Sequence, residues 1–337
     1  TGRLRDQWHG MSRTGTLGRL FGHVPEPALE MSAQDMARQG LVDGDLVRVT
    51  SRRGALVIPV HASAQQAPTQ VFIAMHWGEE FLSGAAADGT PLAGVNALTT
   101  AAFCPRSKQP ELKNAGVKVA KAELPWRLLA LAWLPESDAL AARAALRPLM
   151  REFGFAAVVP FGRERSGVLL RAAALQAPPP ALLQRIEELL GLGAAGVLHY
   201  ADARRGQRRA MRLAGSGDAT RLQGFLVGGD ISAETWLRPL LQDDLPAQAY
   251  GRSLLIAGAK APVAIAPRGR QVCSCFNVSE TEIDAALAEG CGTPQAQLDQ
   301  LQLALRCGTN CGSCLPELRR MIRAHATPPV AAVQEAT

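Results

Sequence analysis

Six of the seven cysteines lie between residues 273 and 314, and the first 272 residues contain only Cys104. Four of the six form two close pairs, Cys273-Ser-Cys275 and, after 35 intervening residues, Cys311-Gly-Ser-Cys314. An odd, clustered set in a chain without an apolar export segment near Thr1 favours metal or redox chemistry in a reducing compartment. We therefore expect a metal site and a cytoplasmic protein, and no framework of disulfides.

Four thiolates in two close pairs can hold a [2Fe–2S] cluster, with one pair on each iron. The alternative is a structural zinc site. Zinc motifs usually separate paired ligands by two to four residues, so the one-residue gap between Cys273 and Cys275 disfavours zinc. We expect Cys291 and Cys307 to be small buried side chains, although exchange of Cys307 for Cys311 as a ligand stays open. The predicted metal ligands are Cys273, Cys275, Cys311 and Cys314.

The sequence around the cysteines predicts short helices. The stretch Ser279-Glu-Thr-Glu282 is a capping box, which predicts a helix that ends at Gly290. Pro316 suits a first helical turn after the second cysteine pair, and an apolar stripe follows it. Residues 269–326 are thus predicted to form a small helical domain, with residues 327–337 as a tail.

The length of 337 residues suggests two or three domains. In residues 1–125, short apolar runs between Gly and Pro predict strands at 46–50, 55–58 and 71–75, after a helix capped by Ser32. This pattern indicates a mixed β-barrel. Residues 126–268 predict an α+β spacer domain, with helices at 140–153, 180–190 and 231–241 and strands at 196–200 and 222–227. The predicted fold class is therefore multidomain α+β.

Composition and charge limit the classes of partner that the chain is expected to bind. Hydrophobic residues make up 47% and charged residues 20%, as in ordinary globular proteins. A net charge of +6 is too mild to require nucleic acid, and the basic residues are not interleaved with stacking aromatics. No apolar run reaches the roughly 18 residues that span a bilayer. We expect neither a nucleic-acid nor a membrane partner.

The opening segment is basic, with arginines at positions 3, 5, 13 and 19 around Trp8-His9-Gly10. Guanidinium groups and the backbone N–H groups of glycine-rich turns suit a pyrophosphate or a nucleotide. A basic segment can equally be a solvated surface. The charges alone therefore leave both interpretations open.

The cysteine region resembles a known family. The stretches Val272–Ser279 and Cys307–Cys314 together resemble the bacterioferritin-associated ferredoxin-like [2Fe–2S] domain. The resemblance covers about 55 residues. It implies that Cys273, Cys275, Cys311 and Cys314 are the cluster ligands.

Residues 1–125 carry a second resemblance. Thr1–Gly10, Leu41–Asp45, His76-Trp77, Asn96–Thr99 and Pro105–Lys113 follow the order seen in the molybdopterin-dinucleotide-binding domain of molybdenum oxidoreductases. The resemblance implies a double-psi β-barrel and dinucleotide contacts from Thr1, Gly2, Arg3, Trp8, His9, Gly10, Asn96 and Lys113. The alternatives are an Asn96 that bonds its own backbone and a Lys113 that is a solvated surface charge. His76-Trp77 fits either a wall of the site or packed core.

The order of these parts resembles the C-terminal portion of bacterial assimilatory nitrate reductase catalytic subunits. The resemblance implies nitrate as substrate, Mo-bis(molybdopterin guanine dinucleotide), the [2Fe–2S] cluster and a flavoprotein, ferredoxin or flavodoxin as electron donor. Because the chain begins without Met, we expect an upstream part, where a [4Fe–4S] cluster and the molybdenum ligand would lie. No catalytic residue is therefore predicted here. The alternatives are a non-catalytic electron-transfer fragment and a relative of formate dehydrogenase.

Overall fold

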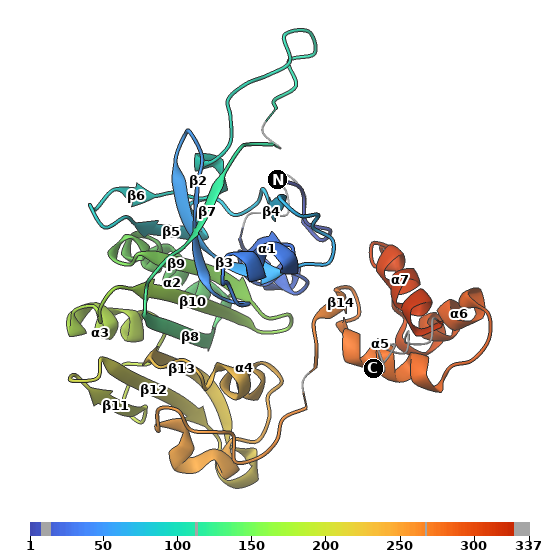
Figure 1. Cartoon of the computed structure of the whole chain (residues 1–337). Coiled ribbons are helices and arrows are strands. Elements are labelled where there is room, and N and C mark those ends of the chain that lie inside the picture. The colour runs from blue at the N-terminus through green and yellow to red at the C-terminus, as the bar shows by residue number, and fades with distance from the viewer. Residues whose placement is uncertain (8–14, 112–113, 267, 327–337) are drawn as a thin grey trace, which may run out of the picture. The chain divides into compact units, whose positions relative to one another are not determined.

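The computed structural model describes residues 1–7, 15–111, 114–266 and 268–326, and it divides into two compact units (Figure 1). Unit 1 comprises residues 1–265 and unit 2 comprises residues 266–337. Four predicted dinucleotide contacts, Trp8, His9, Gly10 and Lys113, lie outside the described residues.

The smaller sheet of unit 1 has five strands in the order β4-β1-β3-β2-β7. β1 and β3 are parallel and the other pairs are antiparallel. The Ser32 hydroxyl caps the helix α1 (Ala33–Arg38), and Gly40 follows with a φ of 63°. The predicted strand at 46–50 is confirmed. The bounds are β1 Leu29–Met31, β2 Leu46–Thr50, β3 Ala55–Ala62, β4 Val71–Ile73 and β7 Lys118–Lys121.

The larger sheet has eight strands in the order β11-β12-β13-β8-β10-β9-β5-β6, all antiparallel. β5 pairs with β9, so this sheet takes strands from both sides of residue 125. The division of unit 1 into two domains at that residue stays a prediction. The bounds are β5 Leu82–Ala85, β6 Pro91–Leu92, β8 Trp126–Leu134, β9 Phe155–Phe161, β10 Ser166–Ala174, β11 Leu198–Asp202, β12 Gln207–Ala214 and β13 Arg221–Gly229.

The central strands of the larger sheet are apolar on both faces because both faces are covered. In β8, Leu128 and Ala130 pack with the helices α2 (Glu136–Leu149) and α3 (Pro180–Leu189). Leu129 and Leu131 point to the opposite face, where α4 (Glu234–Gln242) and the smaller sheet contribute to one continuous core. This two-sided burial explains why the sequence of β8 shows no polar alternation.

Several helix boundaries differ from the predictions. α2 starts at Glu136 and ends at Leu149, whereas we expected 140–153. Its first turn carries Glu136 and Asp138, which favour a helix N-terminus but lie outside the apolar repeat that guided the prediction. α4 likewise starts at Glu234, three residues after the predicted start. Short 3-10 turns complete unit 1: η1 Gly18–Phe21, η2 Val95–Ala97, η3 Met150–Glu152, η4 Gly217–Ala219 and η5 Gln248–Leu254.

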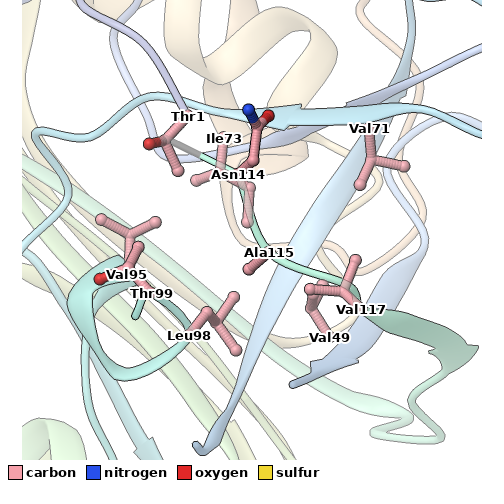
Figure 2. A pocket seen from close by; sticks show the side chains of 10 residues that line it. All are labelled: Thr1, Val49, Val71, Ile73, Val95, Leu98, Thr99, Asn114, Ala115 and Val117. Atoms are coloured by element: carbon pink, nitrogen blue, oxygen red, sulfur yellow. The ribbon is translucent and has the colours of Figure 1, made fainter. Parts of the chain in front are cut away.

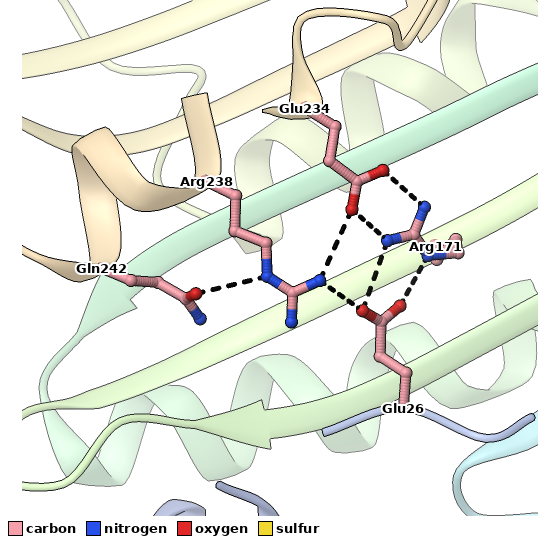
Figure 3. A network of polar contacts seen from close by, with 5 residues as sticks. All are labelled: Glu26, Arg171, Glu234, Arg238 and Gln242. Carbon is pink, nitrogen blue, oxygen red and sulfur yellow. Dashed lines mark hydrogen bonds and ion pairs between the residues drawn. The ribbon is translucent and has the colours of Figure 1, made fainter. Parts of the chain in front are cut away.

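A cluster of four charged side chains ties the N-terminal segment to the larger sheet and to α4 (Figure 3). Arg171 of β10 lies between the carboxylates of Glu26 and Glu234, and its Nη1 is 2.8 Å from Glu234 Oε2. Arg238 donates to both carboxylates, at 2.7 Å to Glu26 and 3.4 Å to Glu234. Gln242 accepts from Arg238 Nε at 3.2 Å. These contacts fix segments that are far apart in the sequence.

The described part of unit 2, residues 266 and 268–326, contains a two-stranded sheet and three helices around a small apolar core. The predicted capping box is confirmed: the hydroxyl of Ser279 accepts from the N–H of Glu282, and the Glu282 carboxylate accepts from the N–H of Ser279. The bounds are β14 Gln271–Cys273, β15 Val278–Ser279, α5 Glu280–Glu289, α6 Pro294–Leu305 and α7 Leu315–Ala326. Among the described helices of the whole chain, none has the length and apolarity to cross a membrane.

Candidate cofactor sites

The four predicted cluster ligands come from two loops of unit 2. Cys273 is the last residue of β14, and Cys275 lies in the turn that leads to β15. Cys311 and Cys314 lie in the loop between α6 and α7. Two antiparallel strands and a helix pair thus bring together residues that are 36 positions apart in the chain.

The closest sulfur contacts join the two motifs. Cys275 Sγ lies 3.3 Å from Cys311 Sγ, and the thiol of Cys314 bonds to the sulfur of Cys273. We call these four residues the cysteine site. The predicted ligands are therefore brought together, in two pairs that each take one cysteine from each motif.

Hydrogen bonds at the cysteine site favour thiolates. The thiol of Cys314 lowers the pKa of Cys273 to about 5, against the opposing effect of burial, and the backbone N–H groups of Phe276, Gly308 and Cys275 add to the decrease. The hydroxyl and N–H of Ser313 lower the pKa of Cys311, and the hydroxyl lies 3.0 Å from Cys311 Sγ. Thiolates are the form that binds metal.

The cysteine site has a buried edge and an exposed edge. Cys273 and Cys314 are 2% and 3% exposed and belong to the core of unit 2. Cys275 is half-buried and Cys311 is exposed. A group held by all four sulfurs would therefore face solvent on the side of Cys275 and Cys311.

The remaining two cysteines of this region, Cys291 and Cys307, differ in burial. Cys307 is fully buried, and its thiol donates to the carbonyl of Leu301 at 3.6 Å. Burial, together with the nearby charge of Cys273, raises the pKa of Cys307 to about 11, so its thiol stays protonated. The expected burial of Cys291 is wrong: this residue is exposed because it lies between Gly290 and Gly292 in the link from α5 to α6.

The residues present fit an iron–sulfur cluster. Four sulfurs converge, at least two have lowered pKa values, and backbone N–H groups point at one of them, as in proteins that hold such clusters. Within the described ranges, no three Cys, His, Asp or Glu side chains adopt the arrangement of a single-ion site.

In unit 1, the first two residues attach to the smaller sheet beside β4. Gly2 forms a parallel bridge with Ala74, and its carbonyl accepts from the N–H of Met75 at 2.9 Å. A Cβ at Gly2 would lie 2.8 Å from the ring of Phe72, so the close approach requires glycine. Arg3 follows with an exposed side chain.

A cavity of about 90 Å³ lies next to this attachment (Figure 2). Thr1 lines it together with Val95 and Thr99, which flank Asn96, and with Asn114, the neighbour of Lys113. The structure thus brings Thr1, the two neighbours of the Asn96 turn and Asn114 to one place. The side chain of Asn96 itself is exposed. The other lining residues are Val49, Val71, Ile73, Leu98, Ala115 and Val117.

Two polar residues of this cavity were not among the predicted contacts, Thr99 and Asn114. Thr99 belongs to the Asn96–Thr99 segment that carried the resemblance, so its hydroxyl could have been considered. Asn114 follows Lys113 directly, but no pattern in the sequence singles it out. For Trp77, the packed alternative holds: it is 1% exposed, with its ring centroid 6.1 Å from that of Phe21 and 6.0 Å from that of Phe81.

Two family models match the chain. Residues 1–116 match the "Molydopterin dinucleotide binding domain", and residues 271–324 match the "BFD-like [2Fe-2S] binding domain". The first range contains the attachment of Gly2 and the cavity. The second contains the cysteine site.

Curated relatives are named nitrate reductase. The relative from Klebsiella oxytoca is 33% identical over 345 residues, which covers 96% of this chain and 33% of the relative. A relative from Shewanella frigidimarina (strain NCIMB 400) is 31% identical over 143 residues, 37% of this chain and 14% of its own length. A relative from Synechocystis sp. (strain ATCC 27184 / PCC 6803 / Kazusa) is 42% identical over 118 residues, which cover 35% of this chain and 15% of the relative.

The chain thus spans about a third of the length of the K. oxytoca relative. The two domain matches assign its cofactors, a molybdopterin dinucleotide and a [2Fe–2S] cluster. Residues 1–116 are a molybdopterin-dinucleotide-binding domain and residues 271–324 a BFD-like [2Fe–2S] domain, in a chain that is similar over 96% of its length to one third of a nitrate reductase.

Proposed function

We propose that this chain is part of a molybdenum-dependent nitrate reductase that reduces nitrate to nitrite in nitrate assimilation. Its role is to bind the molybdopterin guanine dinucleotide and to pass electrons through a [2Fe–2S] cluster. The observation that carries the proposal is the cysteine site, which brings four sulfurs together and leaves one edge exposed. Homology to a nitrate reductase over 96% of the chain supports the substrate.

In this proposal, Cys273, Cys275, Cys311 and Cys314 are the cluster ligands. The bound cluster would supply one-electron transfer. The chain contributes four sulfur ligands, hydrogen bonds that lower the pKa of Cys273 and Cys311, N–H donors that stabilise the charge on Cys273, and a core that shields Cys273 and Cys314 from water. Electrons enter at the exposed edge, beside Cys275 and Cys311. A flavoprotein, a ferredoxin or a flavodoxin delivers them.

The dinucleotide is held by the opening segment and by two later segments of residues 1–116. The proposed contacts are Thr1, Gly2, Arg3, Trp8, His9, Gly10, Asn96 and Lys113. The cavity beside Thr1 supports this choice, because it joins the neighbours of Asn96 and Lys113. Arg3 neutralises phosphate charge through hydrogen bonds of its guanidinium group. We also propose that this region is a double-psi β-barrel.

The rest of the proposal concerns the whole enzyme. The protein acts in the cytoplasm, and residues beyond this chain supply the molybdenum ligand, the nitrate site and a [4Fe–4S] cluster.

A second candidate function applies to the 337 residues alone. Since they span a third of the K. oxytoca relative, they act as an electron-transfer and cofactor-binding module without turnover of their own.

The chain purified without oxygen tests the cluster. We expect two irons and two sulfides per chain and the visible absorption of a [2Fe–2S] cluster, whereas stoichiometric zinc without iron would contradict the proposal. A viologen-linked assay tests the substrate. We expect the full-length protein to reduce nitrate and the 337-residue chain alone to show no turnover. Formate oxidation by the full-length protein without nitrate reduction would instead indicate a formate dehydrogenase.

A further inference from the structure

Arg306 ends helix α6 in a backbone conformation that residues with a Cβ seldom adopt. Its φ and ψ are 58° and 6°, in the left-handed region that favours glycine. The N–H of Arg306 donates to the carbonyl of Gln302 at 3.0 Å, and its own carbonyl accepts from the hydroxyl of Thr309 at 2.7 Å. A strained residue of this kind persists where its surroundings hold it in place.

The side chain of Arg306 lies on an aromatic ring from the other cysteine loop. Its Cζ is 4.6 Å from the centroid of Phe276, which directly follows Cys275. The ring of Phe276 is half-buried against the core of unit 2. Arg306 therefore makes a cation–π contact between the loop before α7 and the turn after β14.

This contact joins two segments that donate hydrogen bonds to the same sulfur. The N–H of Phe276 and the N–H of Gly308, two residues after Arg306, both bond to Cys273. The separation of the two loops sets the length of the hydrogen bond from Gly308, because Cys273 and Phe276 lie in one loop and Gly308 lies in the other. It also sets the separation of Cys275 and Cys311, which are 3.3 Å apart across the same gap. Hydrogen bonds to the sulfurs influence the reduction potential of iron–sulfur clusters.

We propose that Arg306 and Phe276 form a clamp that fixes the separation of the two cysteine loops. Arg306 is then a positioning residue for the [2Fe–2S] cluster. The inference rests on the cluster assignment made under the proposed function. It goes beyond that assignment because Arg306 and Phe276 are not ligands. The clamp explains why an arginine occupies a left-handed position where glycine would avoid the strain.

The clamp is tested in the 337-residue chain with Arg306→Gly, Phe276→Leu and the double variant. Glycine suits the backbone of residue 306, so R306G removes the guanidinium group without adding strain. Arg306→Lys keeps a cation above the ring. The matched control is Arg319→Gln, which removes one exposed arginine charge from α7. The measurements are the rate of iron loss to a chelator and the midpoint potential from an EPR-monitored titration.

We expect R306G and F276L each to speed iron loss about two- to fivefold, the range that an exposed cation–π contact supports. The double variant should lose iron no faster than the faster single variant, because one contact is removed in all three. R306K should stay near the wild type, and R319Q should change neither the rate nor the potential. Both clamp variants should shift the midpoint potential in the same direction.

The proposal is overturned if R306G behaves like R319Q, or if the effects of R306G and F276L multiply in the double variant. Failure of the cluster assignment is a separate result, which the iron and sulfide content of the wild-type chain reveals. The contact between Arg306 and Phe276 can still be tested if the chain binds no cluster. Amide hydrogen exchange at Phe276 and Gly308 in the metal-free chain should be faster in R306G than in R319Q, and equal rates would contradict the clamp.

Discussion

Arg171 donates hydrogen bonds to Glu26, a residue 145 positions earlier in the chain, at 2.5 Å from Nε and 3.3 Å from Nη2 (Figure 3). The two side chains are 17% and 15% exposed. Burial alone would raise the pKa of Glu26, but the charges and hydrogen bonds of Arg171 and Arg238 lower it to about 2. The pair thus anchors the N-terminal segment to β10.

Replacing Glu26 by Gln should destabilise unit 1 by about 2–4 kcal/mol, because Arg171 and Arg238 then share one carboxylate, that of Glu234. All five tryptophans belong to unit 1, so tryptophan fluorescence during urea unfolding reports on it. The control is Glu79→Gln, which removes an exposed pair with Arg147 and should cost less than about 1 kcal/mol. Equal effects of the two substitutions would show that the buried network contributes no more than a surface pair.

The contribution of Glu26 should depend on pH in a defined window. Its pKa in the folded chain is about 2, below the ordinary value of 4.5. The stabilisation is therefore fully present above pH 4.5 and is lost as the pH falls toward 2. A lowering of this size corresponds to about 3 kcal/mol. The difference in unfolding free energy between wild type and Glu26→Gln should stay constant from pH 6 to about pH 4.5 and shrink from there to pH 3, and a difference that is constant over the whole range would contradict this assignment.

Substitutions at the six clustered cysteines should fall into two groups. Cys273→Ser and Cys311→Ser should each abolish stable binding of two irons, because they remove proposed ligands. Cys291→Ser should keep the full iron content, since Cys291 is exposed and outside the cysteine site. Cys307→Ala should also keep it while destabilising unit 2 by about 1 kcal/mol, since it removes a buried thiol that stays protonated. Iron lost from Cys307→Ala but retained in Cys311→Ser would identify Cys307 as the ligand.

Gly308 should resist substitution. Its φ is 82°, and a Cβ there would lie 2.6 Å from Cδ2 of Leu315. Gly308→Ala should therefore destabilise unit 2 by about 1–2 kcal/mol and weaken the hydrogen bond from residue 308 to Cys273. Gly290→Ala is the matched control, because the φ of −83° at Gly290 suits any residue and the nearest atom belongs to the flexible side chain of Gln300. Amide hydrogen exchange within residues 268–326 measures both effects, because it reports on unit 2 separately from the helices of unit 1.

The sequence predicted features that depend on residues close together in the chain. The capping box at Ser279 and the strand at 46–50 were identified because their patterns are local. The convergence of Cys273 and Cys275 with Cys311 and Cys314 followed from their spacing. Helix α6 was missed because its sequence, Pro294–Leu305, is rich in glutamine and carries only a weak apolar stripe.

Features that join distant segments could not be predicted. The sequences of β5 and β9 do not indicate that these strands pair, since each is a short apolar run that could pair with many others. Glu26 and Arg171 likewise look like ordinary surface charges in the sequence. The cavity beside Thr1 depends on Thr99 and Asn114, whose polarity is common in loops. Such features require three-dimensional coordinates.

The joining of β5 to β9, and of β8 to β13, has a consequence for biosynthesis. β8 (Trp126–Leu134) lies between β10 and β13 in the sheet, so it has its second neighbour only after residue 229 has left the ribosome. During translation, the dinucleotide-binding segment must therefore wait for more than a hundred later residues before the sheet behind it is complete. A pterin nucleotide that arrived before that stage would meet an incomplete sheet, so we expect it to bind after residue 229 has been synthesised.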